Sequence, residues 1–225
     1  MTRCITWSTG RRPHTALTAY NAMRLQCEVR ADELVVGRWA DGAPSIPVPM
    51  LEVPGGSRAE VHNSALEYWR MKHEGDIPDV WFAVDDDIVP CQNMFDRMEA
   101  VLEADPEIFL LGAWNDGSQR QENGVPWGWE ALKAGEVIQY GNDFNVGGAV
   151  QAIPKRAIEK VGVYDPKMVW LEDHDYTQRV RATGKQAAIA RTIFAVVLKD
   201  DGDDPNYRAE MTDTFFAKRK EILGW

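Results

Sequence analysis

The chain has 225 residues, of which 44% are hydrophobic and 27% charged, so one domain with a well-buried core is expected. A formal net charge of -10 argues against broad binding to nucleic acid or anionic membranes, which requires a positive surface field. The sequence contains no apolar run near the roughly 20 residues of a membrane span and no apolar signal core, and its three cysteines lack metal-type spacing. We therefore expect a cytoplasmic protein without a membrane span or a disulfide framework.

The first predicted strand, Arg3 to Trp7, ends in the polar turn 8–13, and a helical pattern then covers Thr15 to Leu25. A strand that leads through a turn into a helix presents free backbone N–H groups, and this turn also carries two arginines. Such a turn can hold a phosphate or a nucleotide. The alternative is a solvated loop without a ligand.

A second strand is predicted from Glu33 to Trp39, and a proline-rich loop follows it. Ser57 and Glu60 have the spacing of a capping box, which predicts that a helix begins here and ends near Gly75. The alternation of strands and helices favours an α/β fold in which helices cover a mainly parallel sheet.

The strongest signal lies in residues 80–87, where an apolar run that predicts a buried strand ends in Asp85, Asp86 and Asp87. In open α/β sheets, ligands bind at the carboxyl ends of the strands. Adjacent carboxylates repel one another unless something neutralises them, and a divalent cation that prefers oxygen ligands does so well. These residues indicate a metal and phosphate site, with an acidic turn or helix N-cap as the alternative.

After the acidic residues, a helix with an apolar stripe is predicted from Pro90, and a short strand from Ile108 to Ala113. Residues 114–145 then combine several glycines with three tryptophans. This composition predicts a loop over a site in which a tryptophan ring stacks on a sugar or a base. The alternative is that the three rings simply pack beneath a long loop.

Two features in the last third of the chain stand out. The paired glycines Gly147 and Gly148 lie beside an apolar run, where they allow the backbone to approach a ligand or another element closely. A helix is predicted from Pro154 to Gly162. Further on, Glu172 and Asp173 lie at the start of another helix, where the helix dipole stabilises negative charge.

The end of the chain adds three predicted elements. A strand covers Ala187 to Leu198, an acidic turn covers 199–205, and an amphipathic helix covers Tyr207 to Leu223.

Taken in chain order, these motifs resemble the GT-A glycosyltransferases of the inverting, family-2-like kind, from the first strand to about Leu198. The three acids are similar to the family's DxD motif, the paired glycines to its glycine segment, and residues 170–173 with the downstream Arg179 and Gly184 to its ED segment. The resemblance implies a GT-A (Rossmann-like) α/β fold, with a mostly parallel central sheet flanked by helices.

The resemblance also implies a single catalytic domain over residues 1–225. Its nucleotide-binding half, with the DxD motif, would span 1–113. The acceptor half, with the ED motif, would span 114–205, and a C-terminal helix would span 206–225.

The implied activity is transfer of a sugar from a nucleotide-sugar donor, with a UDP-sugar as the first expectation, to an acceptor hydroxyl with inversion. Asp173 would be the catalytic base and Glu172 would position the donor or the acceptor. Mn²⁺ or Mg²⁺, held chiefly by Asp87 together with Asp85, would neutralise the departing diphosphate. The donor-binding residues implied are Thr9, Gly10, Arg11, Asp85, Asp86, Gly147, Gly148, Trp170 and Arg179.

Two positions depart from the family pattern or have a second interpretation. The family commonly supplies a further metal ligand, often a histidine, near the end of the domain, but His174 is the last histidine here. Asp200 or Asp201 is the candidate substitute, because both carboxylates are also hard oxygen donors. Arg179 could instead form a structural salt bridge with the acidic residues around it.

The acceptor stays open among a glycan, a lipid carrier, a protein side chain and a hydroxymethylated DNA base. Two other functions compete with sugar transfer. The segment 84–89 also fits the DxDx(T/V) motif of haloacid-dehalogenase-like phosphatases, with Asp85 as nucleophile, although that motif normally follows the first strand. A non-catalytic sugar-binding domain with a GT-A-like fold is the other alternative, and the intact carboxylates argue against it.

Overall fold

The computed structural model describes residues 1–9, 13–38, 49–53, 56–115, 137–139, 146–168 and 171–198. Over these residues helices alternate with strands, which confirms the predicted α/β class. The helices are α1 (Pro13–Gln26), α2 (Arg58–Lys72), α3 (Met94–Ala104), α5 (Lys155–Val161) and α6 (Glu172–Ala182). The strands are β1 (Arg3–Thr9), β2 (Leu34–Arg38), β3 (Met50–Glu52), β4 (Val80–Asp85), β5 (Ile88–Pro90), β6 (Ile108–Asn115), β7 (Val137–Gln139), β8 (Val150–Pro154) and β9 (Gln186–Val197).

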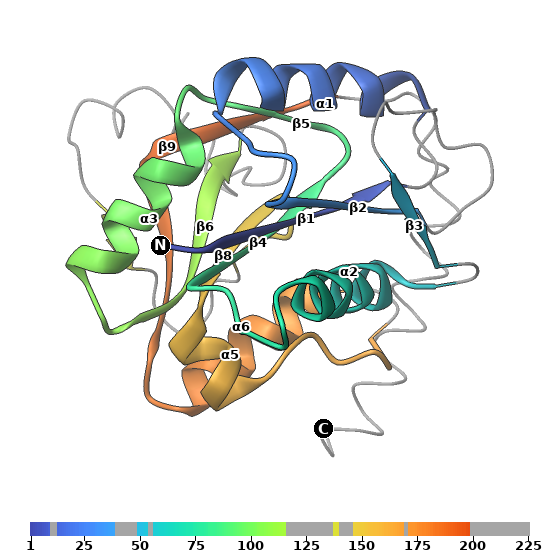
Figure 1. Ribbon diagram of the computed structural model, residues 1–225. Coiled ribbons are helices and arrows are strands. Elements are labelled where there is room, and N and C mark those ends of the chain that lie inside the picture. Colours follow the sequence, from blue (N-terminus) through green and yellow to red (C-terminus); the bar gives the residue numbers. More distant parts are fainter. Residues whose placement is uncertain are drawn as a thin grey trace, which may run out of the picture.

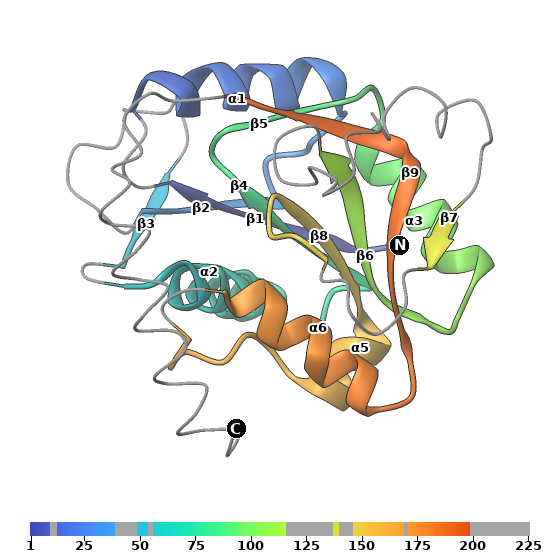
Figure 2. The ribbon, with the colours of Figure 1, turned by 180° about the vertical axis from the view of Figure 1, so that it is seen from behind.

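The described strands form one sheet in the order β3-β2-β1-β4-β8-β6-β9-β5 (Figure 1). β7 pairs with β9 outside this path (Figure 2). β1 is parallel to β2 and β4, β2 is parallel to β3, and β6 is parallel to β9. β8 is antiparallel to both of its neighbours, β4 and β6, so β6 and β9 run in the same direction as β4. The sheet is therefore mixed but mostly parallel, and the strands that share a direction end at one edge.

Two helical layers cover the sheet, with α1 and α3 on one face and α2, α5 and α6 on the other (Figures 1 and 2). β4 shows why both faces are apolar, since Phe82 and Val84 point into one core while Trp81 and Ala83 point into the other. Side chains alternate between the faces of a strand, so a strand covered on both sides is apolar throughout. The buried run of β4 can only become polar where it leaves the sheet.

The capping box predicted for α2 is present. The Ser57 side chain accepts a hydrogen bond from the Glu60 N–H, and the Glu60 carboxylate accepts one from the Ser57 N–H. These two bonds satisfy donors that the first turn of a helix otherwise leaves unpaired. They determine where α2 begins, and the first helical residue is Arg58.

The helix predicted from Pro90 was placed too early. Pro90 ends the short strand β5, in which it pairs with Ala195 of β9, and α3 begins only at Met94. Proline is tolerated at the edge of a sheet because its missing N–H is not needed there, and β5 lies at the end of the strand order. Asn93, with φ of 53°, adopts the left-handed conformation immediately before the helix.

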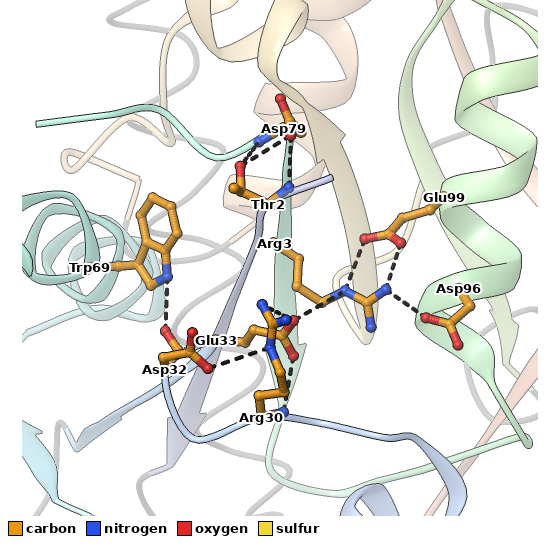
Figure 3. Close-up of polar contacts among 9 residues, drawn as sticks. All are labelled: Thr2, Arg3, Arg30, Asp32, Glu33, Trp69, Asp79, Asp96 and Glu99. Atoms are coloured by element: carbon orange, nitrogen blue, oxygen red, sulfur yellow. Dashed lines mark hydrogen bonds and ion pairs between the residues drawn. The ribbon is translucent and has the colours of Figure 1, made fainter. Parts of the chain in front are cut away.

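Ion pairs around the start of β1 hold the end of the sheet that lies away from the three aspartates (Figure 3). Arg3 donates to both Glu99 oxygens of α3, at 3.0 and 2.6 Å, and to Asp96 at 2.5 Å. Glu33, which precedes β2, lies 3.9 Å from Arg3 and also pairs with Arg30 at 3.0 Å. This network joins β1, α3 and the entry to β2 at the edge remote from the three aspartates.

Among the described residues, no helix is both long and apolar enough to cross a membrane. The three cysteines, Cys4, Cys27 and Cys91, are buried and carry free thiols.

Candidate active site

The end of β1 and the aspartates at the end of β4 meet because the two strands are parallel neighbours. Ser8 lies opposite Asp85 in the register of the strands. The Thr9 hydroxyl donates to Asp86 Oδ2 at 3.1 Å, and the indole N–H of Trp7 donates to the Asp85 carbonyl at 2.8 Å. The predicted donor residues Thr9, Asp85 and Asp86 are therefore brought together, whereas Gly10 and Arg11 lie outside the described residues.

Asp87 lies where the end of β9 approaches β4. The Leu198 N–H donates to the Asp87 carbonyl at 2.7 Å, and the next residue, Ile88, pairs with Val197. The side chains of Asp86 and Asp87 are both buried, with the residues 6% exposed. Asp200, the candidate further metal ligand, follows Leu198 by two positions in the sequence but lies outside the described residues.

Arg58 is at the centre of the site. Its guanidinium Nε donates to Asp85 Oδ1, Nη1 donates to Glu172 Oε1, and Nη2 donates to the carbonyl of Gly148. Its side chain is only 18% exposed, and that of Glu172 only 5%. Burial alone would lower the pKa of Arg58, but the charges of Asp85 and Glu172 raise it well above its ordinary value. One cation thus joins the carboxylate at the end of β4 to the carboxylate at the start of α6.

The sequence interpretation overlooked Arg58, although a signal was present. A cation in the first turn of a helix lies at the positive end of the helix dipole, which is unfavourable unless an anion is near. Arg58 directly follows the capping residue Ser57, so its position already indicated an acidic partner.

Gly148 makes the close approach that the paired glycines predicted, although the approaching group is a side chain of the same protein. A Cβ atom at position 148 would lie 2.9 Å from Arg58 Nη1 and 3.0 Å from Cζ. The Ala149 carbonyl accepts from the Asp85 N–H at 3.1 Å, which holds this turn beside the end of β4. Only glycine leaves room here for the guanidinium in its present place.

Glu172 and Asp173 lie in the first turn of α6, facing the end of β4. Burial is the largest influence on both groups and raises the pKa of each, while the positive charge of Arg58 opposes the increase. Asp173 also accepts a hydrogen bond from the His174 N–H at 2.8 Å. This bond and the nearby Gly148 N–H lower the pKa of Asp173, whereas the negative charge of Asp85 raises it. The carboxylates of Asp85 and Asp173 thus interact across the site, although 88 positions separate them in the sequence.

Arg179 lies two helical turns further along α6 and is not among the residues around Arg58. Its guanidinium donates to Asp175 at 2.7 Å and to the carbonyls of Val161 and Val163 at 3.1 and 3.0 Å. It also lies 4.9 Å above the ring of Tyr176. These contacts favour the structural alternative for Arg179, as a tie between α6 and the end of α5. Trp170 lies outside the described residues.

The donor set at the end of β4 consists of carboxylate oxygens. In the described part of the chain, no group of three histidine, cysteine or acidic side chains gathers as a metal site. Mg²⁺ and similar hard cations are often held by one or two carboxylates together with phosphate oxygens of the substrate, so three protein ligands are not required. Asp85 and Asp87 fit such a cation by the chemistry of their oxygens.

Comparison with known proteins gives a match in structure only. No known protein-family profile matches the sequence, and neither does any curated protein. The mannosyltransferase PcManGT from Pyrobaculum calidifontis, in complex with GDP-Man and Mn²⁺, matches with a TM-score of 0.63 at 13% identity, over 98% of this chain and 65% of that one. GalNAc-T7 with UDP, GalNAc and Mn²⁺ matches with a TM-score of 0.64 at 12% identity, over 98% and 51%.

A third match is TarS of S. aureus in complex with UDP-GlcNAc, with a TM-score of 0.63 at 10% identity, over 99% of this chain and 73% of that one. The chain spans less than two thirds of PcManGT and about half of GalNAc-T7.

These matches define the class of fold: the chain has the GT-A fold of glycosyltransferases, as the sequence motifs predicted. The fold also removes support from the phosphatase alternative. Asp85 ends β4, an interior strand reached after β1, β2 and β3, whereas the phosphatase motif follows the first strand.

Proposed function

We propose that this protein is a metal-dependent glycosyltransferase that moves a sugar from a nucleotide-sugar donor to an acceptor hydroxyl, with inversion at the anomeric carbon. One observation carries the proposal. Arg58 joins Asp85 to Glu172, which brings the acids at the end of β4 and those at the start of α6 into one site beside Gly148. A group-transfer reaction needs a place for the leaving group and a base in the same site.

The donor would lie across the carboxyl ends of β1 and β4. Asp85 would contact the nucleoside and Asp86 the ribose or the sugar, while the turn with Thr9, Gly10 and Arg11 would line the nucleotide pocket. The remaining donor contacts proposed are Gly147, Gly148 and Trp170, whereas Arg179 is assigned the structural role described above. UDP is the proposed nucleotide, since GalNAc-T7 and TarS were solved with UDP and UDP-GlcNAc, although PcManGT contains GDP-Man.

Asp87, with Asp85 and Asp200, would hold a Mn²⁺ or Mg²⁺ ion. When bound, such an ion neutralises the charge that builds on a diphosphate leaving group. PcManGT and GalNAc-T7 were both solved with Mn²⁺.

Asp173 is the proposed base. Its carboxylate would accept the proton of the acceptor hydroxyl as the oxygen attacks the anomeric carbon from the side opposite the leaving group. Burial raises the pKa of Asp173, so its carboxylate takes up a proton more readily than an exposed aspartate does. Glu172, held by Arg58, would orient the reacting groups rather than take up the proton. Direct displacement with a single base inverts the anomeric centre.

The experiment combines binding with turnover. UDP-sugars and GDP-sugars are screened by thermal shift with and without Mn²⁺. The true donor should raise the melting temperature of the protein, because ligands that bind only the folded state stabilise it. With the donor found, release of the nucleotide should require Mn²⁺ and should fall by at least about a hundredfold in Asp173→Asn. Hydrolysis of a generic phosphomonoester in place of a nucleotide sugar would contradict the proposal, and donor binding without any turnover would favour a non-catalytic sugar-binding domain.

A further inference from the structure

A polar pair is buried in the middle of the sheet below the site. Gln151 of β8 is 0% exposed, and it lies between Ala83 of β4 and Gly112 of β6. The hydroxyl of Tyr164, which is 1% exposed, donates to Gln151 Oε1. The pair takes no part in the mechanism described above, so its burial needs another reason.

The amide nitrogen of Gln151 connects the pair to the backbone of Val146. Gln151 Nε2 donates to the carbonyl of Val146 at 2.8 Å. A carbonyl only accepts, so the amide nitrogen must face Val146 and the amide oxygen must face Tyr164. Burial raises the pKa of Tyr164 well above its ordinary value, which keeps its hydroxyl protonated and able to donate. The orientation of the pair is therefore fixed at both ends.

Val146 is held from two more sides. Its N–H donates to the Thr177 hydroxyl at 3.2 Å, and that hydroxyl donates to the backbone carbonyl of Asp173 at 2.8 Å. Its side chain packs on Gly112, where an added Cβ would lie 2.5 Å from Val146 Cγ1. Val146 is thus tied to β8, to β6 and to the first turn of α6.

Gly148 follows Val146 by two residues, and both of its backbone polar groups face the site. Its carbonyl accepts from Arg58, and its N–H acts on the Asp173 carboxyl, whose pKa it lowers. A shift of the Gly148 backbone would therefore alter the positions of the Arg58 guanidinium and of Asp173, the proposed base, together. The turn is anchored by the hydrogen bonds of Val146 before it and by β8 after it.

An apolar pair of similar size could fill the same space. Buried polar groups cost free energy unless every hydrogen bond is made, and a satisfied pair adds little net stability over an apolar one. What a satisfied pair adds is a defined geometry, since hydrogen bonds depend on distance and angle more sharply than apolar contacts do.

We propose that Gln151 and Tyr164 are positioning residues that hold the Gly147–Gly148 turn so that the Gly148 peptide lies between Arg58 and Asp173. The role in catalysis rests on the proposed function, whereas the structural part does not. Neither side chain touches the reacting groups, and both act through Val146.

Two variants remove the hydrogen bonds and keep the volume. Tyr164→Phe deletes only the hydroxyl, and Gln151→Met replaces the amide with an apolar chain of similar length. Tyr176→Phe is the matched control, because Tyr176 is equally buried, packs against Tyr164 with ring centroids 5.4 Å apart, and donates to the Gly162 carbonyl away from the turn. A stability loss common to all three variants is thereby separated from an effect on the site.

Amide hydrogen exchange of the segment 146–150 provides a readout that needs no activity. We expect exchange there to become about tenfold faster in Tyr164→Phe and Gln151→Met, and to stay unchanged in Tyr176→Phe. With the donor identified, kcat should fall by about tenfold or more in the two variants, while the KM for the donor changes by less than about twofold.

Each arm decides a separate point. Exchange at 146–150 that is no faster in the two variants than in Tyr176→Phe would overturn the positioning role. Faster exchange with kcat equal to that of Tyr176→Phe would overturn its link to the reaction. Faster exchange in a protein that turns over no nucleotide sugar would support the hold on the Gly148 turn and would refute the proposed function instead.

Discussion

The guanidinium of Arg58 occupies the space that a Cβ at Gly148 would need, and its ion pairs with Asp85 and Glu172 join the two halves of the site. A Cβ at position 148 would lie within 3.0 Å of three guanidinium atoms, while the same guanidinium contacts Asp85 and Glu172. Residues from three separated parts of the sequence therefore depend on one glycine for their arrangement.

Gly148→Ala tests this arrangement. The added methyl group should displace the guanidinium, weaken both ion pairs and destabilise the protein by about 1–3 kcal/mol. Nucleotide affinity should fall as well, because Asp85 loses its partner. Denaturant unfolding and nucleotide titration check the two effects. Gly75→Ala is the control, since Gly75 has φ of 88° and open space around it, so it should lose about 1 kcal/mol of stability without any change in affinity.

Arg58→Met should leave Glu172 buried beside Asp173 without a compensating cation. We expect a loss of about 2–4 kcal/mol, reduced from the value for a fully buried pair because the Arg58 side chain is 18% exposed. Adding Glu172→Gln should recover part of that loss, and a double-mutant cycle measures the coupling. Arg70→Met on the same helix is the control, because its partner Glu67 is 61% exposed and the pair should contribute less than about 1 kcal/mol. Additive losses in the cycle would contradict the pairing of Arg58 with Glu172.

Asp87→Asn should abolish most of the Mn²⁺-dependent part of nucleotide affinity, because an amide oxygen carries no charge to attract the cation. Calorimetric titration of the nucleotide with and without Mn²⁺ measures that part directly. Asp96→Asn is the control, since Asp96 pairs with Arg3 at the opposite edge of the sheet. Equal Mn²⁺ dependence in the wild type and in Asp87→Asn would remove Asp87 from the proposed site.

The buried His62 should make the free energy of unfolding depend on pH. Burial, followed by the charge of Arg58, lowers the pKa of His62 well below its ordinary value, and its Nδ1 lies 2.8 Å from the Thr6 hydroxyl. The unfolded chain takes up a proton near pH 6.5 that the folded protein does not, so stability is full above that pH and falls as the pH drops below it. His62→Gln should reduce the slope of unfolding free energy against pH by up to about 1.4 kcal/mol per pH unit below pH 6.5. An unchanged slope would show that His62 takes up its proton in the folded state too.

The elements that depend on local pattern were predictable. β4 was recognised because an apolar run of strand-forming residues must be buried, and the start of α2 because Ser57 and Glu60 have capping-box spacing. The predicted start of α3 at Pro90 is wrong because the local pattern there was ambiguous. Proline suits both the first turn of a helix and an edge strand, and only the pairing of Pro90 with Ala195 decides between them.

By itself, the sequence determined the fold class and the two acidic groups, because hydrophobic periodicity and adjacent charges act over a few residues and are visible in a linear string. Only the tertiary structure decided that the acids of β4 and α6 share one site, that Arg58 joins them, and that Gln151 and Tyr164 lie beneath the Gly148 turn. These contacts connect residues up to 114 positions apart. Their existence depends on strand order and on the reversed direction of β8, which no local pattern encodes.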